Sequence, residues 1–276
     1  MVLGALPVAL AFPAVAQSHP PVYVALGDSY TAGPGIPNQL FDPLGCFRSD
    51  HDYPHLVAQA LGLSLRDVSC SGAETADMTS AQEVFGGANR PQLQAVDAET
   101  DVVTLSIGGN DLGFTEISSD CTSLLPSGTP CQRRYVTGAG DELARRISET
   151  APKVAAVLTE IHRRAPRAKV FVVGYPAVLP DGGTGCWPTM PYTAGDVPYL
   201  RGVEKQLNAM LAAQAAARAT FVDVYPASIG HDTCALPTAR WVEPVVPLAV
   251  AAPIHPNSVG MAGVAAVVAA KMRAAR

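Results

Sequence analysis

The sequence predicts an α/β protein with a parallel central sheet that is covered by helices on both faces. Short apolar runs rich in β-branched residues alternate along the chain with longer segments whose apolar residues recur every three or four positions. The short runs are apolar almost without interruption, which is typical of strands buried on both faces. Helical connections between such strands favour parallel pairing.

Five runs are predicted strands: Val22–Leu26, Leu65–Val68, Val102–Ile107, Val170–Val173 and Phe221–Val224. Helical periodicity marks residues 56–61, 143–161 and 203–211 between them. Pro152 lies within the second of these segments, so we expect either a kink there or a helix that begins near it.

The last helix is predicted over Val259–Met272, with Asn257 and Ser258 as candidate caps. Residues 112–134 and 176–198 are rich in Gly, Pro, Ser and Thr and each contains cysteines, so we expect disulfide-stapled loops there. No composition shift follows residue 21, which predicts one domain over residues 22–276.

Composition excludes several classes of protein. The chain has 276 residues, of which 48% are apolar, so it can bury a sizeable core and is not disordered. Its formal net charge of −5 opposes binding to a polyanion, so we expect no nucleic-acid partner. No run after the leader described below reaches the roughly 18 apolar residues of a membrane span, so we expect no stable membrane insertion.

Residues 1–16 are interpreted as a signal peptide. The stretch is apolar and ends in Ala14-Val15-Ala16, a small-residue cleavage signature. A positively charged n-region is missing, which we interpret as a truncated leader or a mis-set start. The predicted protein is therefore exported.

Six cysteines stand at positions 46, 70, 121, 131, 186 and 234, without a CxxC pair or a Cys/His cluster of metal-ligand spacing. An exported protein favours disulfides. The alternative is six unpaired buried thiols, and even with disulfides the sequence alone permits fifteen pairings.

Ser29 is the candidate nucleophile. It follows the first predicted strand in Gly27-Asp28-Ser29-Tyr30, where a tight glycine turn can present its hydroxyl at the carboxyl edge of the sheet. The alternative is an ordinary helix-capping serine. The surrounding residues do not match G-x-S-x-G, so the nucleophile elbow of the usual α/β-hydrolases is not predicted.

Two further strand ends carry candidate oxyanion donors. Asn110, in Gly108-Gly109-Asn110-Asp111, offers a side-chain amide, although the same four residues also make an excellent turn. Gly72, two residues after Cys70, offers a backbone N–H. We expect Asp28 and Asp111 to bind backbone in these turns rather than to titrate in catalysis.

His255 lies immediately before the last predicted helix, where a general base would be held in place. A structural role is the alternative. His51 and His55 have a spacing of four, but Pro54 lies between them and no third ligand is near in sequence. We therefore expect no metal site and no cofactor.

Ser29, Gly72, Asn110 and His255 occur in the order of the SGNH (GDSL) hydrolase superfamily, in the motifs GDSY, SG, GGND and HPN. The chain most resembles the secreted lipase/esterase subgroup of actinobacteria, from about residue 22 to residue 270. The resemblance implies a flavodoxin-like three-layer α/β/α fold. It also implies the disulfides Cys46–Cys70, Cys121–Cys131 and Cys186–Cys234.

The resemblance also assigns roles: Ser29 is the nucleophile, His255 the base, and the N–H groups of Ser29 and Gly72 with the Asn110 side chain form the oxyanion hole. The sequence departs from the family's pattern at the catalytic acid: Ala252 stands where most members have the Asp of a D-x-x-H motif. We therefore predict a Ser-His dyad whose imidazole is oriented by the carbonyl of Ala252. Asp232 is the alternative acid.

The function predicted by the resemblance is a secreted serine carboxylester hydrolase, an esterase or lipase acting on acyl esters, most simply as a monomer. A carbohydrate or cell-envelope O-acylesterase and a non-catalytic binding module are the alternatives. Several apolar residues in loops could either line an acyl site or form small cores: Leu124, Leu125, Trp187, Trp241, Val242 and Val245.

Overall fold

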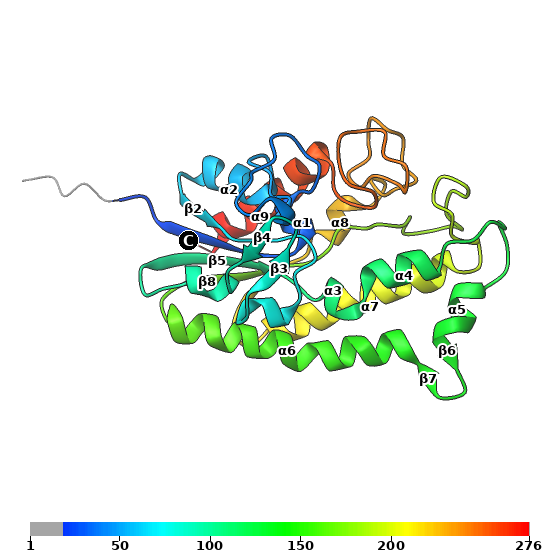
Figure 1. The fold of residues 1–276 in the computed structure, drawn as a ribbon, viewed down its shortest axis with the longest axis horizontal. Helices are drawn as coiled ribbons and strands as arrows, with labels where there is room; N and C mark the ends of the chain where they lie inside the picture. The colour runs from blue at the N-terminus through cyan, green and yellow to red at the C-terminus, as the bar shows by residue number, and fades with distance from the viewer. Residues whose placement is uncertain (1–18, 276) are drawn as a thin grey trace, which may run out of the picture.

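A computed structural model of the chain describes residues 19–275, so the leader predicted over residues 1–16 lies outside the described part. Five strands form a parallel sheet in the order β2-β1-β5-β8-β9 (Figure 1). Their bounds are β1 (Val22–Gly27), β2 (Ser64–Asp67), β5 (Thr100–Ser106), β8 (Lys169–Val173) and β9 (Thr220–Val222). Each corresponds to one predicted run, which confirms the α/β class and the parallel sheet.

Helices cover both faces of this sheet (Figure 1). Tyr23 and Ala25 of β1 belong to a core shared with α2 (Tyr53–Leu61) and α9 (Ser258–Ala274). Val24 and Leu26 face the opposite side, which is packed by α6 (Glu142–Arg164) and α7 (Val197–Ala215). All four β1 side chains are fully buried. The uninterrupted apolar run therefore reflects a three-layer α/β/α arrangement, as the resemblance implied.

The helix ends follow their capping residues. The side chain of Asn257 accepts a hydrogen bond from Gly260 N at 2.9 Å, so α9 begins where it was predicted. Asp141 caps α6 in the same way, and that helix continues through Pro152. Of the two alternatives expected at Pro152, a kink or a helix start, the helix start is not observed, because the Asp141 cap lies upstream. No helix among residues 19–275 combines the length and apolarity that crossing a bilayer requires.

The two predicted insertions differ from each other. Residues 112–134 are largely helical, with α3 (Gly109–Leu112), α4 (Phe114–Asp120) and α5 (Pro130–Tyr135), whereas residues 176–196 contain no regular element. Disulfides join Cys46–Cys70, Cys121–Cys131 and Cys186–Cys234, which is the predicted pairing. The remaining elements are short: α1 (Ser29–Ala32), η1 (Leu44–Cys46), η2 (Thr75–Met78), β3 (Gln82–Val84), β4 (Gly87–Asn89), η3 (Gln92–Ala95), β6 (Val136–Thr137), β7 (Gly140–Asp141) and α8 (Tyr225–Ser228).

Parallel pairing brings the carboxyl ends of β2, β1 and β5 to one edge of the sheet. The segments that follow these three strands contain Gly72, Ser29 and Asn110, respectively. The fold therefore gathers the candidate residues from separate parts of the sequence.

Candidate active site

Ser29 is the first residue of α1, directly after the turn that ends β1. Asp28 caps this short helix, its Oδ1 accepting a hydrogen bond from Tyr30 N at 2.9 Å. Gly27 is required here because a Cβ at this position would lie 2.8 Å from the Ser106 carbonyl oxygen. The strand can thus pass closely beside β5 and present the Ser29 hydroxyl at the sheet edge.

The His255 ring bridges Ser29 and a backbone carbonyl. Its Nε2 lies 2.8 Å from Ser29 Oγ, and its Nδ1 lies 2.7 Å from the carbonyl oxygen of Pro253. A carbonyl can only accept, so Nδ1 carries the proton and Nε2 presents its lone pair to the serine hydroxyl. This is the tautomer that a general base needs.

The predicted orienting carbonyl was wrong by one residue. The Ala252 carbonyl accepts a hydrogen bond from the His255 backbone N at 3.3 Å and does not bind the ring. Ile254 adopts a left-handed backbone (φ 58°), and the resulting turn directs the Pro253 carbonyl at Nδ1 instead. The Tyr30 hydroxyl donates a hydrogen bond to the Ile254 carbonyl at 2.7 Å and holds this turn against α1.

Among the described residues, no carboxylate contacts either ring nitrogen of His255. Asp232, the alternative acid, is buried and its Oδ1 accepts a hydrogen bond from Cys234 N at 2.9 Å, a local loop contact. Burial lowers the pKa of His255, and the Pro253 carbonyl opposes that shift only in part. The neutral form of the His255 imidazole is therefore favoured, with no carboxylate beside it among the described residues.

Three hydrogen-bond donors stand beside Ser29. The Ser29 N–H is the first of α1, and the N–H of Gly72 belongs to a residue with a left-handed backbone (φ 79°). Neither has an acceptor within residues 19–275. Asn110 Nδ2 donates to the Ala73 carbonyl at 2.9 Å, which fixes the amide and leaves its second N–H for an oxyanion. All three residues line one cavity with His255.

Hydrogen bonds of Asp28 and Asp111 connect the turns around Ser29 and Asn110 to neighbouring segments. The Tyr175 hydroxyl donates to Asp28 and accepts from Gly109 N at 3.0 Å, which joins the serine turn to the Gly-Gly-Asn turn. Asp111 Oδ2 accepts from Thr75 N at 2.9 Å, just beyond the Gly72 segment. Both acids bind backbone as expected, and burial raises the pKa of Asp28 to about 7.

The shared cavity has a volume of about 240 Å³. Apolar side chains from α4, α7 and the loop after β8 form much of its wall: Phe114, Ile117, Val178, Tyr192, Leu200 and Leu207. Glu204 is the acidic residue in the wall; its Oε1 accepts from Val178 N at 3.0 Å, and burial raises its pKa to about 8. Burial of an acyl chain fits such a cavity.

The loop residues proposed from sequence for an acyl site do not line this cavity. Leu124 and Leu125 are exposed, whereas Trp241 stacks on His231. The wall residues on α7 follow the helical periodicity at 203–211, but that pattern cannot distinguish a core face from a cavity wall.

Comparisons with known proteins relate the chain to one enzyme family. The GDSL-like lipase/acylhydrolase family matches residues 25–262. The chain is 42% identical to Lipase 2 of Streptomyces coelicolor, covering 91% of this chain and 86% of that protein. It is 33% identical to an esterase of Streptomyces scabiei, covering 82% and 77%.

Two crystal structures are similar over nearly their whole length. An extracellular lipase from Streptomyces rimosus matches with a TM-score of 0.75 and 30% identity, covering 91% of this chain and 99% of that one. Phospholipase A1 from Streptomyces albidoflavus matches with a TM-score of 0.71 and 26% identity, covering 92% and 99%. The chain therefore belongs to the GDSL-like lipase/acylhydrolase family and is an ester hydrolase.

Proposed function

We propose that the protein is an exported lipase/esterase that cleaves esters of medium and long acyl chains through an acyl-enzyme on Ser29. The observation that carries this proposal is the 2.8 Å contact between Ser29 Oγ and His255 Nε2 in the wall of an apolar cavity. A hydroxyl is activated as a nucleophile by a neutral imidazole within hydrogen-bond reach.

In the first step His255 Nε2 takes the hydroxyl proton as Ser29 Oγ attacks the ester carbonyl carbon. The N–H groups of Ser29 and Gly72 and the Asn110 amide bind the developing oxyanion. The imidazolium then donates its proton to the leaving alcohol. Water attacks the acyl-enzyme in the same way, with His255 as the base, and releases the carboxylic acid and free Ser29. Throughout, the Pro253 carbonyl 2.7 Å from Nδ1 holds the ring in orientation.

The cavity wall supports an acyl group longer than acetyl. Phe114, Leu200 and Leu207 offer apolar surface to a hydrocarbon chain. An O-acetylesterase would leave most of this apolar surface uncovered. We therefore place the acyl chain in the cavity and the alcohol on the solvent side.

The location and state of the protein are part of the proposal. Three disulfides in a chain of this size favour an oxidising compartment, in line with the predicted leader. Residues 22–276 act as one catalytic domain, and we propose that the protein acts as a monomer.

Hydrolysis of p-nitrophenyl esters from acetyl to palmitoyl tests the proposal. Ser29→Ala should lose at least about 10⁴-fold in kcat, while Ser119→Ala, at an exposed serine of α4 that does not line the cavity, is the matched control and should keep the wild-type rate. Equal rates for wild type and Ser29→Ala would exclude the nucleophile. A maximum at acetyl would favour the O-acylesterase. Failure of a fluorophosphonate to label Ser29 would favour a binding module.

A further inference from the structure

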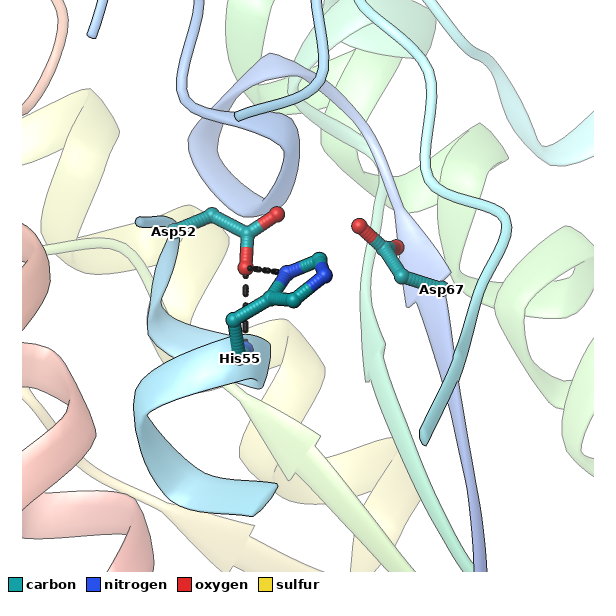
Figure 2. Close-up of side chains that lie close together, drawn as sticks. All are labelled: Asp52, His55 and Asp67. Carbon is teal, nitrogen blue, oxygen red and sulfur yellow. Dashed lines mark hydrogen bonds and ion pairs between the residues drawn. The ribbon is translucent and has the colours of Figure 1, made fainter. Parts of the chain in front are cut away.

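A second group of titratable side chains lies behind the catalytic turn (Figure 2). Asp52 caps α2, His55 lies in the first turn of that helix, and Asp67 is the last residue of β2. One ligand atom from each lies within 4.8 Å of the others. His55 thus bonds to Asp52 and lies near Asp67, which is twelve residues away along the chain.

The hydrogen bonds around this group fix the state of each side chain. Asp52 Oδ1 lies 3.0 Å from His55 N and 2.7 Å from His55 Nδ1, so Nδ1 carries a proton and Nε2 has a free lone pair. Asp67 Oδ1 accepts from Ser69 N at 3.0 Å and from Ser69 Oγ at 2.7 Å. One oxygen of each carboxylate is therefore committed.

The remaining donor atoms converge without a partner. Asp52 is fully buried, and within the described residues neither its Oδ2 nor Asp67 Oδ2 has a hydrogen-bond partner. Figure 2 shows the second oxygen of Asp52 and the outer nitrogen of His55 directed toward the side on which Asp67 lies. Asp52 is buried and Asp67 and His55 are half-buried, and lone-pair atoms gathered in this way attract a cation.

A divalent metal ion can use all three side chains at once. The carboxyls of Asp52 and Asp67 are close enough to share a proton, which pairs two oxygens, whereas a metal ion would bind both carboxylates and the imidazole. An imidazole nitrogen oriented by a carboxylate on its other nitrogen is a common feature of metal sites. Two carboxylate oxygens with one imidazole suit zinc, with water completing the coordination.

Access and local charge are compatible with a reversible site. The His55 side chain is 30% exposed and gives the ion a route from solvent. Arg48 is close enough to lower the pKa of Asp52, an effect that burial and Asp67 outweigh. The Arg48 guanidinium donates to the Ser69 carbonyl at 2.8 Å and not to either carboxylate, so it does not fill the space.

We propose that Asp52, His55 and Asp67 form a binding site for one divalent transition-metal ion, with zinc as the best match. The ion would join the start of α2 to the end of β2, from which the chain runs through Cys70 to Gly72. It would thereby stabilise the segment that carries an oxyanion donor, without taking part in the chemistry at Ser29.

Zinc binding to untagged, chelator-treated protein tests this site. Equilibrium dialysis with elemental analysis should find one zinc per chain, and zinc at about 100 times its Kd should raise the Tm by roughly 5 to 10 °C. Asp67→Asn and His55→Gln should abolish both effects. His51→Gln is the matched control, because His51 contacts Asp50 in an exposed pair on the same segment, and it should leave both effects unchanged.

Other outcomes would overturn the proposal. Wild type that binds no stoichiometric zinc refutes the site, as does loss of binding in His51→Gln alone. Binding of calcium but not zinc refutes the transition-metal assignment. Asp52→Asn keeps a side chain that can cap α2. If wild type binds no zinc and the Asp52→Asn variant has a higher Tm than wild type, the two aspartates share a proton and the metal site is refuted.

Discussion

Removing the Asn110 side chain should cost catalysis far more than stability. The amide makes one protein hydrogen bond, 2.9 Å from Nδ2 to the Ala73 carbonyl. Losing that bond in Asn110→Ala should lower the free energy of unfolding by about 0.5–1.5 kcal/mol. Losing an oxyanion donor typically lowers kcat by about 10²–10³-fold, or about 2.7–4 kcal/mol of transition-state stabilisation. KM should change little, because the donor acts mainly on charge that develops in the transition state.

The assay is steady-state hydrolysis of a p-nitrophenyl ester with urea unfolding measured on the same samples. Asn110→Asp provides a second variant of nearly equal size that has no N–H and adds negative charge, so its kcat should fall below that of Asn110→Ala. A folded Asn110→Ala enzyme within about tenfold of wild type would refute the assignment of Asn110 to the oxyanion hole.

Four further predictions concern groups around the site. Because burial lowers the pKa of His255, kcat/KM should rise with pH through a midpoint below about 6.5, and a midpoint above that value would contradict the stated cause. Ala252→Asp should change kcat by less than about tenfold, since His255 Nδ1 already has an acceptor at 2.7 Å; a larger increase would show that the carbonyl orients the ring poorly. Glu204, with its pKa raised to about 8, is neutral below that pH and charged above it, so activity on long-chain esters should fall as pH rises through 8 in wild type but stay level in Glu204→Gln. Tyr175→Phe removes the acceptor of Gly109 N and should lower both Tm and kcat; a drop in Tm with unchanged kcat would limit this tyrosine to a structural role.

The sheet could be predicted from sequence because its strands are buried on both faces. In β1, Tyr23 and Val24 face opposite helical layers and both are fully buried, so the run is apolar throughout and easily recognised. The candidate site was predictable for a related reason. Ser29 and Asn110 follow such strands within a few residues, and the carboxyl ends of parallel strands meet at one edge.

Features that depend on tertiary geometry could not be predicted from the pattern of the sequence. The left-handed conformation of Ile254 decides whether the Ala252 or the Pro253 carbonyl faces the imidazole, and no local residue type signals that conformation. The residues of the cavity wall could not be predicted either, since Leu200 and Leu207 have the periodicity of any core-facing helix.

The acids near the site show what replaces a third catalytic residue here. Asp28 binds the Tyr30 N–H of its own turn, Asp111 binds the Thr75 N–H of a neighbouring segment, and the Tyr175 hydroxyl joins Asp28 to Gly109. These bonds connect the turns that contain Ser29, Gly72 and Asn110, while the Pro253 carbonyl accepts a hydrogen bond from the His255 ring. A carbonyl dipole stabilises an imidazolium less than a carboxylate does, so in the proposed mechanism the site would depend more heavily on preorganised donors for its transition-state stabilisation. It follows that substitutions which loosen the turns should reduce kcat even where they leave Ser29 and His255 in contact.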